Sequence, residues 1–185
     1  MEDSRIHIRY AKALFEIAEE QNFVDRAYED TLLIKDVCKS NKDFEMLLAS
    51  PIIHTGKKVA IIKEVFTNSL HPVSLSFLLL IIKKRREANI RLIAESFIHI
   101  YKEYKGIKTA YLKTAIELDE TTRKEFVALL AGQTNKTIEL REIVKPELLG
   151  GFVITIDDKE SDNSISDKIQ RLKKEYDVNI YEKKL

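Results

Sequence analysis

The chain has 185 residues, 44% of them apolar and 33% charged, which indicates a helix-rich globular protein rather than a disordered one. Its 31 Lys and Arg residues nearly balance 30 Asp and Glu residues, which disfavours a dedicated nucleic-acid binder, since such proteins are usually basic. The single cysteine, Cys38, excludes an intrachain disulfide and a multi-cysteine metal site, so we expect a reducing compartment.

Six successive helices are predicted for residues 1–105, because apolar side chains recur there every three to four positions. Asp3 or Ser4 is expected to cap the first helix and Thr55 the fourth. Pro51 ends the third helix, since proline disfavours helical geometry in the residue before it. The apolar stripes of these helices comprise Ile6, Tyr10, Ala13, Leu14, Ile17, Val24, Ala27, Thr31, Ile34, Cys38, Val59, Ile62, Phe66 and, facing inward on the sixth helix, Ile90, Phe97, Tyr101 and Tyr104.

The fifth helix differs from the others because it is apolar nearly all round. Pro72 suits its first turn, and the apolar run extends from Val73 to Ile82. Such a helix belongs at the centre of a bundle or beneath a partner. The run is about half of the roughly 20 residues that span a bilayer, and charged residues interrupt Met1 to Arg9, so we expect membrane association only through a partner.

At Gly106 the apolar spacing changes from a period of 3.6 residues to a period of 2. A strand with Ala110, Leu112, Thr114 and Ile116 on one face is expected to follow. Further along, the chain predicts a helix capped by Asp119, a strand around Ile138 and Leu140, a strand over 152–156, a turn over 157–159, and a last helix after Ser164. The predicted fold is mainly α, with a six-helix bundle (1–105) followed by a small α+β domain (106–185).

No constellation of residues indicates catalysis. The four histidines are isolated from one another and from other metal ligands. Thr55-Gly56-Lys57-Lys58 lacks the upstream glycine and the final Ser or Thr of a phosphate-binding loop. The acidic segment 158–162 resembles the start of a calcium loop but lacks its turn glycine and its closing glutamate. We therefore expect no enzyme, no cofactor, no metal and no small-molecule substrate.

Lys83 to Arg86 form one dense basic run, which has two interpretations. The run can contact nucleic acid or an acidic partner helix. Alternatively, it complements the dipole at the end of the fifth helix, for about 0.3–1 kcal/mol per cation. The near-neutral total charge favours the second interpretation.

Two segments carry a resemblance to a known family. Residues 10–18 (YAKALFEIA) resemble the opening helix of the delta subunits of F-type ATP synthases and of their mitochondrial counterpart, the oligomycin-sensitivity protein. Residues 138–154 (IELREIVKPELLGGFVI), followed by Asp162-Asn-Ser-Ile-Ser166, are similar to that family's C-terminal signature. Lys145 and Asp157-Asp158 depart from the usual turn residues of the family. The resemblance covers the whole chain.

The resemblance implies a non-catalytic subunit of the peripheral stalk (the stator) of a proton-translocating ATP synthase. In the family, the N-terminal bundle holds the N-terminal helix of an α subunit, and the C-terminal domain holds the end of the b-subunit stalk. This implies a peripheral location at the cytoplasmic face of the inner membrane in a bacterium. For the α-subunit helix, we expect a groove formed by Tyr10, Ala13 and Leu80.

The signature residues Gly150, Gly151, Phe152, Asp162 and Ser164 are expected to serve folding. The glycines permit a sharp entry into the strand, and the two polar residues satisfy the free amides at the start of the last helix. Phe152 is expected to bury against Ile169 and Leu172 of that helix. The alternative to the stator function is a helical RNA-binding regulator of the antitermination type, with Lys83 to Arg86 as its basic patch.

Overall fold

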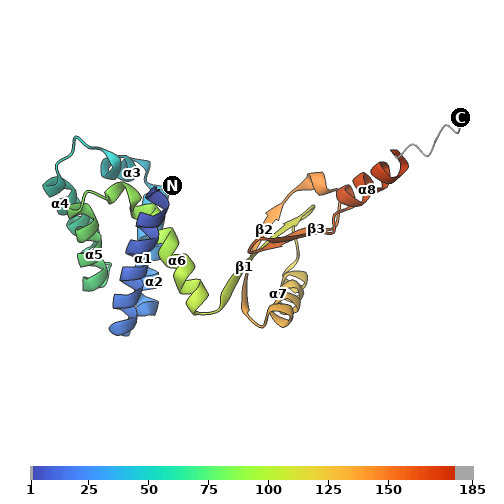
Figure 1. Ribbon diagram of the computed structural model, residues 1–185, viewed down its shortest axis with the longest axis horizontal. Helices are drawn as coiled ribbons and strands as arrows, with labels where there is room; N and C mark the ends of the chain where they lie inside the picture. The colour runs from blue at the N-terminus through green and yellow to red at the C-terminus, as the bar shows by residue number, and fades with distance from the viewer. Residues whose placement is uncertain (1, 178–185) are drawn as a thin grey trace, which may run out of the picture. The chain divides into compact units, whose positions relative to one another are not determined.

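The computed structural model describes residues 2–177, and the side chains of residues 5–176 (Figure 1). The chain divides into two compact units, Met1–Lys105 and Gly106–Leu185. The division falls at the glycine where the apolar spacing changes. Gly106 has a φ of 66°, a conformation that glycine adopts without the steric cost that a side chain adds.

The N-terminal unit is a six-helix bundle, as the sequence predicts. Its core is centred on the fully buried side chains of Ile62, Phe97 and Ile82, and α1 and α2 both pack along α6 (Figure 1). The helices are α1 (Glu2–Glu20), α2 (Val24–Ser40), α3 (Lys42–Ala49), α4 (Thr55–Phe66), α5 (Pro72–Lys83) and α6 (Ile90–Tyr104), with the short 3-10 helix η1 (Glu87–Asn89) before α6.

Two predicted helix starts and one predicted core position are wrong. Helix α1 already begins at Glu2, so Asp3 and Ser4 lie inside it rather than capping it. Thr55 is the first residue of α4, and the preceding His54 makes no side-chain capping bond. Tyr104 is 55% exposed, although its ring meets Phe15 edge-on.

The C-terminal unit is a four-stranded sheet with helices, among residues 106–177. The strand order is β2-β1-β3-β4; β1 and β2 are parallel, and the other neighbours are antiparallel. Helix α7 is the crossover between the two parallel strands. The elements are β1 (Ile107–Thr114), α7 (Glu120–Thr134), β2 (Thr137–Val144), the 3-10 helix η2 (Pro146–Leu148), β3 (Phe152–Ile156), β4 (Lys159–Asp162) and α8 (Ile165–Asp177).

One face of this sheet packs on α7, where Ala110, Leu130 and Ile138 form the core. The predicted alternation of β1 is confirmed at Ala110, Leu112 and Thr114, all of them buried. Ile116 is a correction, because β1 ends at Thr114 and the Ile116 side chain is 74% exposed. The turn predicted over 157–159 is confirmed at Asp157 and Asp158, but it ends there: Lys159 to Asp162 of the acidic segment form strand β4, which pairs with β3.

Candidate functional site

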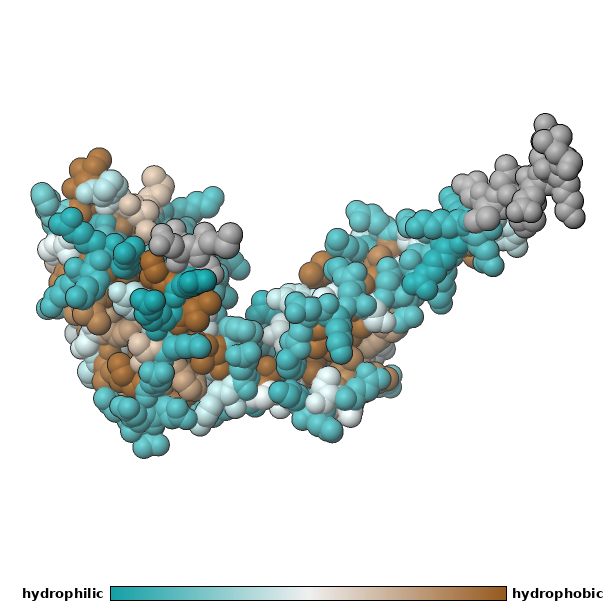
Figure 2. All heavy atoms as spheres, in the orientation of Figure 1, coloured by the Kyte–Doolittle hydropathy of each residue, from teal (hydrophilic) through white to brown (hydrophobic). Residues whose placement is uncertain are grey.

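Helix α1 meets α5 through an aromatic contact. The ring of Tyr10 packs edge-on against Phe77, with 6.3 Å between the ring centroids, and so brings α1 against α5. Tyr10 and Ala13 are half-buried, while Leu80, one turn beyond Phe77, is 43% exposed. We call Tyr10, Ala13 and Leu80 the α1–α5 surface; Figure 2 shows apolar side chains interspersed with polar ones on the visible face of this unit.

Helix α5 is held in place by polar contacts from α2. The backbone N–H of His71 donates to Oδ2 of the buried Asp30 at 3.0 Å, and Arg26 donates to the carbonyl of Ser69 at 2.8 Å. The ring of His71 accepts a hydrogen bond from the N–H of Val73 and caps the helix. Sequence reasoning missed Asp30, although an acidic residue beside the apolar stripe of α2 was a visible signal.

Lys58 is a second residue whose structural role the sequence did not reveal. Its side chain is 2% exposed, and its amine donates to the carbonyl of Leu48 and to Oε1 of Glu87, both at 2.6 Å. These bonds join α4 to the end of α3 and to η1. Lys58 therefore has a structural role, which is consistent with the absence of a phosphate-loop pattern around it.

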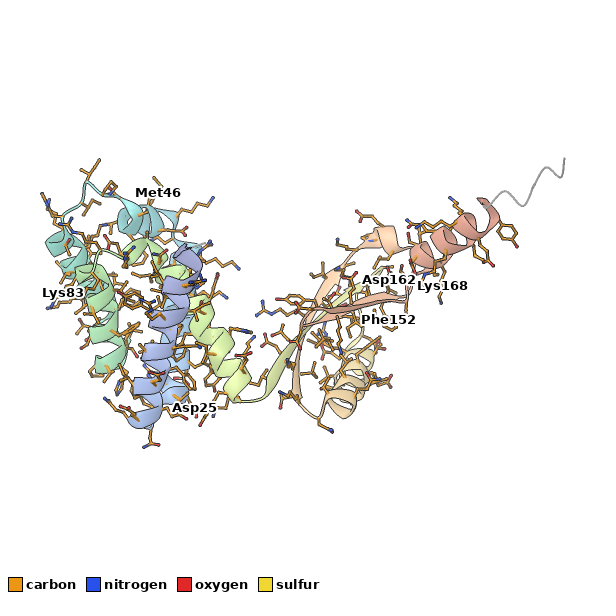
Figure 3. The ribbon with its side chains drawn as sticks, in the orientation of Figure 1. Asp25, Met46, Lys83, Phe152, Asp162 and Lys168 are labelled. Atoms are coloured by element: carbon orange, nitrogen blue, oxygen red, sulfur yellow. The ribbon has the colours of Figure 1, made fainter. Side chains whose placement is uncertain are left out.

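The basic run lies at the end of α5. Lys83 occupies the last turn of the helix and Lys84 follows as its C-cap, so the predicted placement at the helix terminus is confirmed (Figure 3). The four side chains from Lys83 to Arg86 are exposed. No observation in the described part of the chain favours the RNA-binding alternative over a cationic helix end.

The signature glycines lie directly against the start of α8. Gly151 has a φ of 74°, and a Cβ added there would lie 2.3 Å from the carbonyl oxygen of Asn163. A Cβ added at Gly150 would lie 2.6 Å from Cδ1 of Ile165. Backbone bonds close the same contact: Ile165 N–H donates to the Gly150 carbonyl at 3.0 Å, and Asn163 N–H to the Phe152 carbonyl at 2.9 Å. We call Gly150, Gly151 and Asn163 the α8 junction.

Asp162 and Ser164 cap the last helix. The N–H of Ser164 donates to Oδ1 of Asp162 at 2.8 Å, and the N–H of Asp167 donates to Oγ of Ser164 at 3.1 Å. Hydrogen bonds from Ser164 hold the pKa of the Asp162 carboxyl below its usual range. Ser164 is 1% exposed, so this cap is built into the body of the unit, as the sequence predicts.

The predicted burial of Phe152 against α8 is wrong. The ring of Phe152 instead meets Phe126 of α7 edge-on, with 5.0 Å between centroids. Ile169 and Leu172 are 38% and 53% exposed, and α8 packs chiefly against η2 (Figure 3). Periodicity identified the apolar face of α8 correctly but could not tell what covers it.

The described residues offer no site for catalysis by a bound metal. Among them, no group of three or more His, Cys, Asp or Glu side chains is placed to hold a metal ion. Nor does any helix in this part of the chain combine the length and apolarity needed to cross a membrane. Each unit exposes apolar side chains, among them Leu80 of α5 in the first unit and Ile169 and Leu172 of α8 in the second.

Comparisons with known proteins find relatives along nearly the whole chain. The sequence model of the family described as ATP synthase delta (OSCP) subunit matches residues 6–176. ATP synthase subunit delta of Amoebophilus asiaticus is 34% identical, over 94% of this chain and 95% of that protein. The subunit of the same name from Cytophaga hutchinsonii is also 34% identical, over 95% of this chain and 96% of that protein.

A solved structure supports the fold independently. A chain in the cryo-EM structure of the Toxoplasma gondii mitochondrial ATP synthase hexamer matches with a TM-score of 0.75 and 16% sequence identity. The match covers 94% of this chain and 98% of that chain, so both units share its fold. The family model and the sequence relatives show that the chain belongs to the ATP synthase delta (OSCP) subunit family.

Proposed function

We propose that the α1–α5 surface binds the N-terminal helix of an ATP synthase α subunit, and that the C-terminal unit binds the end of the b-subunit stalk. The chain is a non-catalytic peripheral-stalk subunit of ATP synthase, which links the catalytic head to the stalk and resists the torque of the rotor. In a bacterial host, we place it at the cytoplasmic face of the cell membrane, attached through the complex.

One observation carries the proposal for the head. Leu80 is 43% exposed on a helix whose other faces bury Phe77, Leu78 and Ile81 in the core. An incoming amphipathic helix inserts apolar side chains at a spacing of three and four residues, and it needs an apolar surface with few obstructions. Ala13 permits close approach because its side chain is a single methyl group.

Two cations border the α1–α5 surface and can orient the incoming helix. Lys83 and Lys84 follow Leu80 by three and four positions on the same side of α5, and both are exposed. Rim charges contribute little affinity but set the partner's register and speed association. We therefore expect acidic residues in the part of the α-subunit helix that lies near the end of α5.

Calorimetric titration of the full chain with a peptide of the α-subunit N-terminus from the same organism tests this function. We expect saturable one-to-one binding, and a loss of at least tenfold in affinity for Ala13→Trp, because the indole fills the space of the incoming helix. Ala60→Trp is the matched control, since Ala60 is exposed on α4.

The outcomes separate the function from the location. Absence of binding by folded wild-type chain would contradict the head-connector function itself. Equal affinities of Ala13→Trp and wild-type chain would contradict the α1–α5 surface as the binding site. Circular dichroism and urea unfolding of each variant establish that the protein is folded.

A further inference from the structure

We propose that α8 forms one strand of a two-helix coiled coil whose partner helix carries acidic residues beside its apolar stripe. The identification of the partner as the b-subunit stalk rests on the proposed function. The acidic, amphipathic character of the partner is inferred from the side chains of α8 alone.

The apolar side chains of α8 have the spacing of a coiled-coil seam. Ile165, Ile169, Leu172 and Tyr176 are separated by four, three and four positions, which is the alternation of a and d positions in a heptad. They are 44%, 38%, 53% and 86% exposed, respectively. We call these four residues the α8 stripe. A continuous stripe with this spacing fits a second helix lying alongside at a shallow angle, not a globular pocket.

The length of α8 supports the need for a partner. The helix has 13 residues, and isolated helices shorter than about 12–15 residues are marginal in water. Tertiary packing normally supplies the missing stability, but here the helix packs chiefly against η2, and its stripe remains exposed. A docked helix would bury the stripe and stabilise α8 together with the interface.

The charges beside the stripe define the partner. With Ile169 and Leu172 as a and d, Lys168 and Lys173 occupy the flanking g and e positions nearest the centre of the stripe. Among residues 5–176, no acidic side chain pairs with either lysine, whereas Arg171, outside the flanks, is paired with Asp167 at 2.6 Å. Cations at e and g positions select a partner with Glu or Asp at the facing positions.

The α8 junction attaches the N-terminal end of α8 rigidly to the sheet. The Ile165 N–H bond to Gly150 and the close approach of Gly151 to Asn163 fix the first turn of α8 to the start of β3. A side chain at Gly151 would meet backbone atoms of Asn163 and Ser164 rather than a flexible side chain, so the first turn of α8 cannot easily shift relative to Gly151. Force applied along the partner helix is therefore passed into the sheet, and the residues of the signature act as positioning residues for the stripe.

The experiment uses the full chain and two designed four-heptad peptides with Leu at a and d, one with Glu and the other with Lys at e and g. We expect at least tenfold tighter binding of the Glu peptide. Lys168→Glu combined with Lys173→Glu should invert that preference. Leu172→Asp should lose at least tenfold in affinity for the Glu peptide, while Gln170→Asp, the same charge off the stripe, should stay within about twofold.

A parallel titration uses the cytoplasmic part of the same organism's b subunit. Equal affinity for the two peptides, or wild-type affinity of Leu172→Asp, overturns the inference. If the b-subunit fragment binds Leu172→Asp as tightly as wild type, the chain binds the stalk but not through the α8 stripe. If the Glu peptide binds through the stripe but the b fragment does not bind, the α8 stripe is a coiled-coil surface whose partner is not the b subunit.

Discussion

The amine of Lys58 lies 2.6 Å from Oε1 of Glu87, and the two side chains are only 2% and 12% exposed. This pair joins the first turn of the bundle's fourth helix to the short helix that precedes α6. Because both charged groups are almost completely shielded from solvent, each needs the opposite charge of the other to offset its desolvation cost. The lysine amine donates a second hydrogen bond, to the carbonyl of Leu48 at 2.6 Å.

Lys58→Met should therefore destabilise the N-terminal unit by about 3–5 kcal/mol, since it leaves Glu87 buried and unpaired. Adding Glu87→Met should recover a large part of that loss, because the uncompensated charge is then removed as well. Urea unfolding monitored by circular dichroism measures both. The exposed neighbour Lys57 provides the control, and Lys57→Met should change stability by no more than about 0.5 kcal/mol. Additive losses in the double variant would show that the two side chains are not coupled.

Gly151→Ala should destabilise the C-terminal unit. Its φ of 74° alone disfavours a side chain by about 1–3 kcal/mol, and the added Cβ would also lie 2.3 Å from the carbonyl oxygen of Asn163. Gly132→Ala should do the opposite, because Gly132 lies inside α7 with nothing within 4 Å of an added Cβ. In a helix interior that change stabilises by up to about 1 kcal/mol. Equal thermal midpoints for the two variants would contradict the close contact at the α8 junction.

Glu142 should make the stability of the C-terminal unit depend on pH. Arg123 donates to its carboxylate at 2.8 Å, as does the N–H of Leu118, and these bonds hold the pKa of Glu142 below its usual range. Since the folded pKa is lower than the unfolded one, the contribution is complete above the unfolded value of about 4.3. It is lost as the pH falls through the folded pKa.

The measurement compares wild-type chain with Glu142→Gln in urea unfolding at neutral pH and at successively lower pH. The variant should be less stable than wild type at neutral pH, and the difference should shrink on acidification. Other carboxylates with lowered pKa values, such as Asp162 and Glu160, contribute equally to both proteins and cancel in the difference. A difference that stays constant with pH would show that the Arg123 bond does not favour the charged form.

The parts of the fold that the sequence predicted correctly are those set by local chemistry. The six helices follow from the spacing of apolar residues, and the change of architecture at Gly106 follows from a change in that spacing. Ser164 caps α8 because a short side chain with an acceptor oxygen can reach the free amides of the first turn. Each of these features depends on residues a few positions apart.

Strand β4 could not be predicted in this way. Its four residues, Lys159 to Asp162, contain no apolar alternation, and Lys159 and Glu160 are exposed. They form a strand because β3 offers unpaired backbone groups on one side, from Val153 to Ile156. Backbone pairing across a sheet edge leaves no signal in side-chain composition.

For the two candidate sites, the sequence determined which side chains share a helix face, and only the tertiary structure decided what covers that face. The pattern of Ile165, Ile169 and Leu172 is the same as that of a core helix, yet the structure leaves these residues exposed. Lys58 shows the reverse case, a charged residue buried because its partner Glu87 lies 29 positions away. Local sequence sets torsion preferences and the faces of each element, whereas burial depends on which distant segments come together in space.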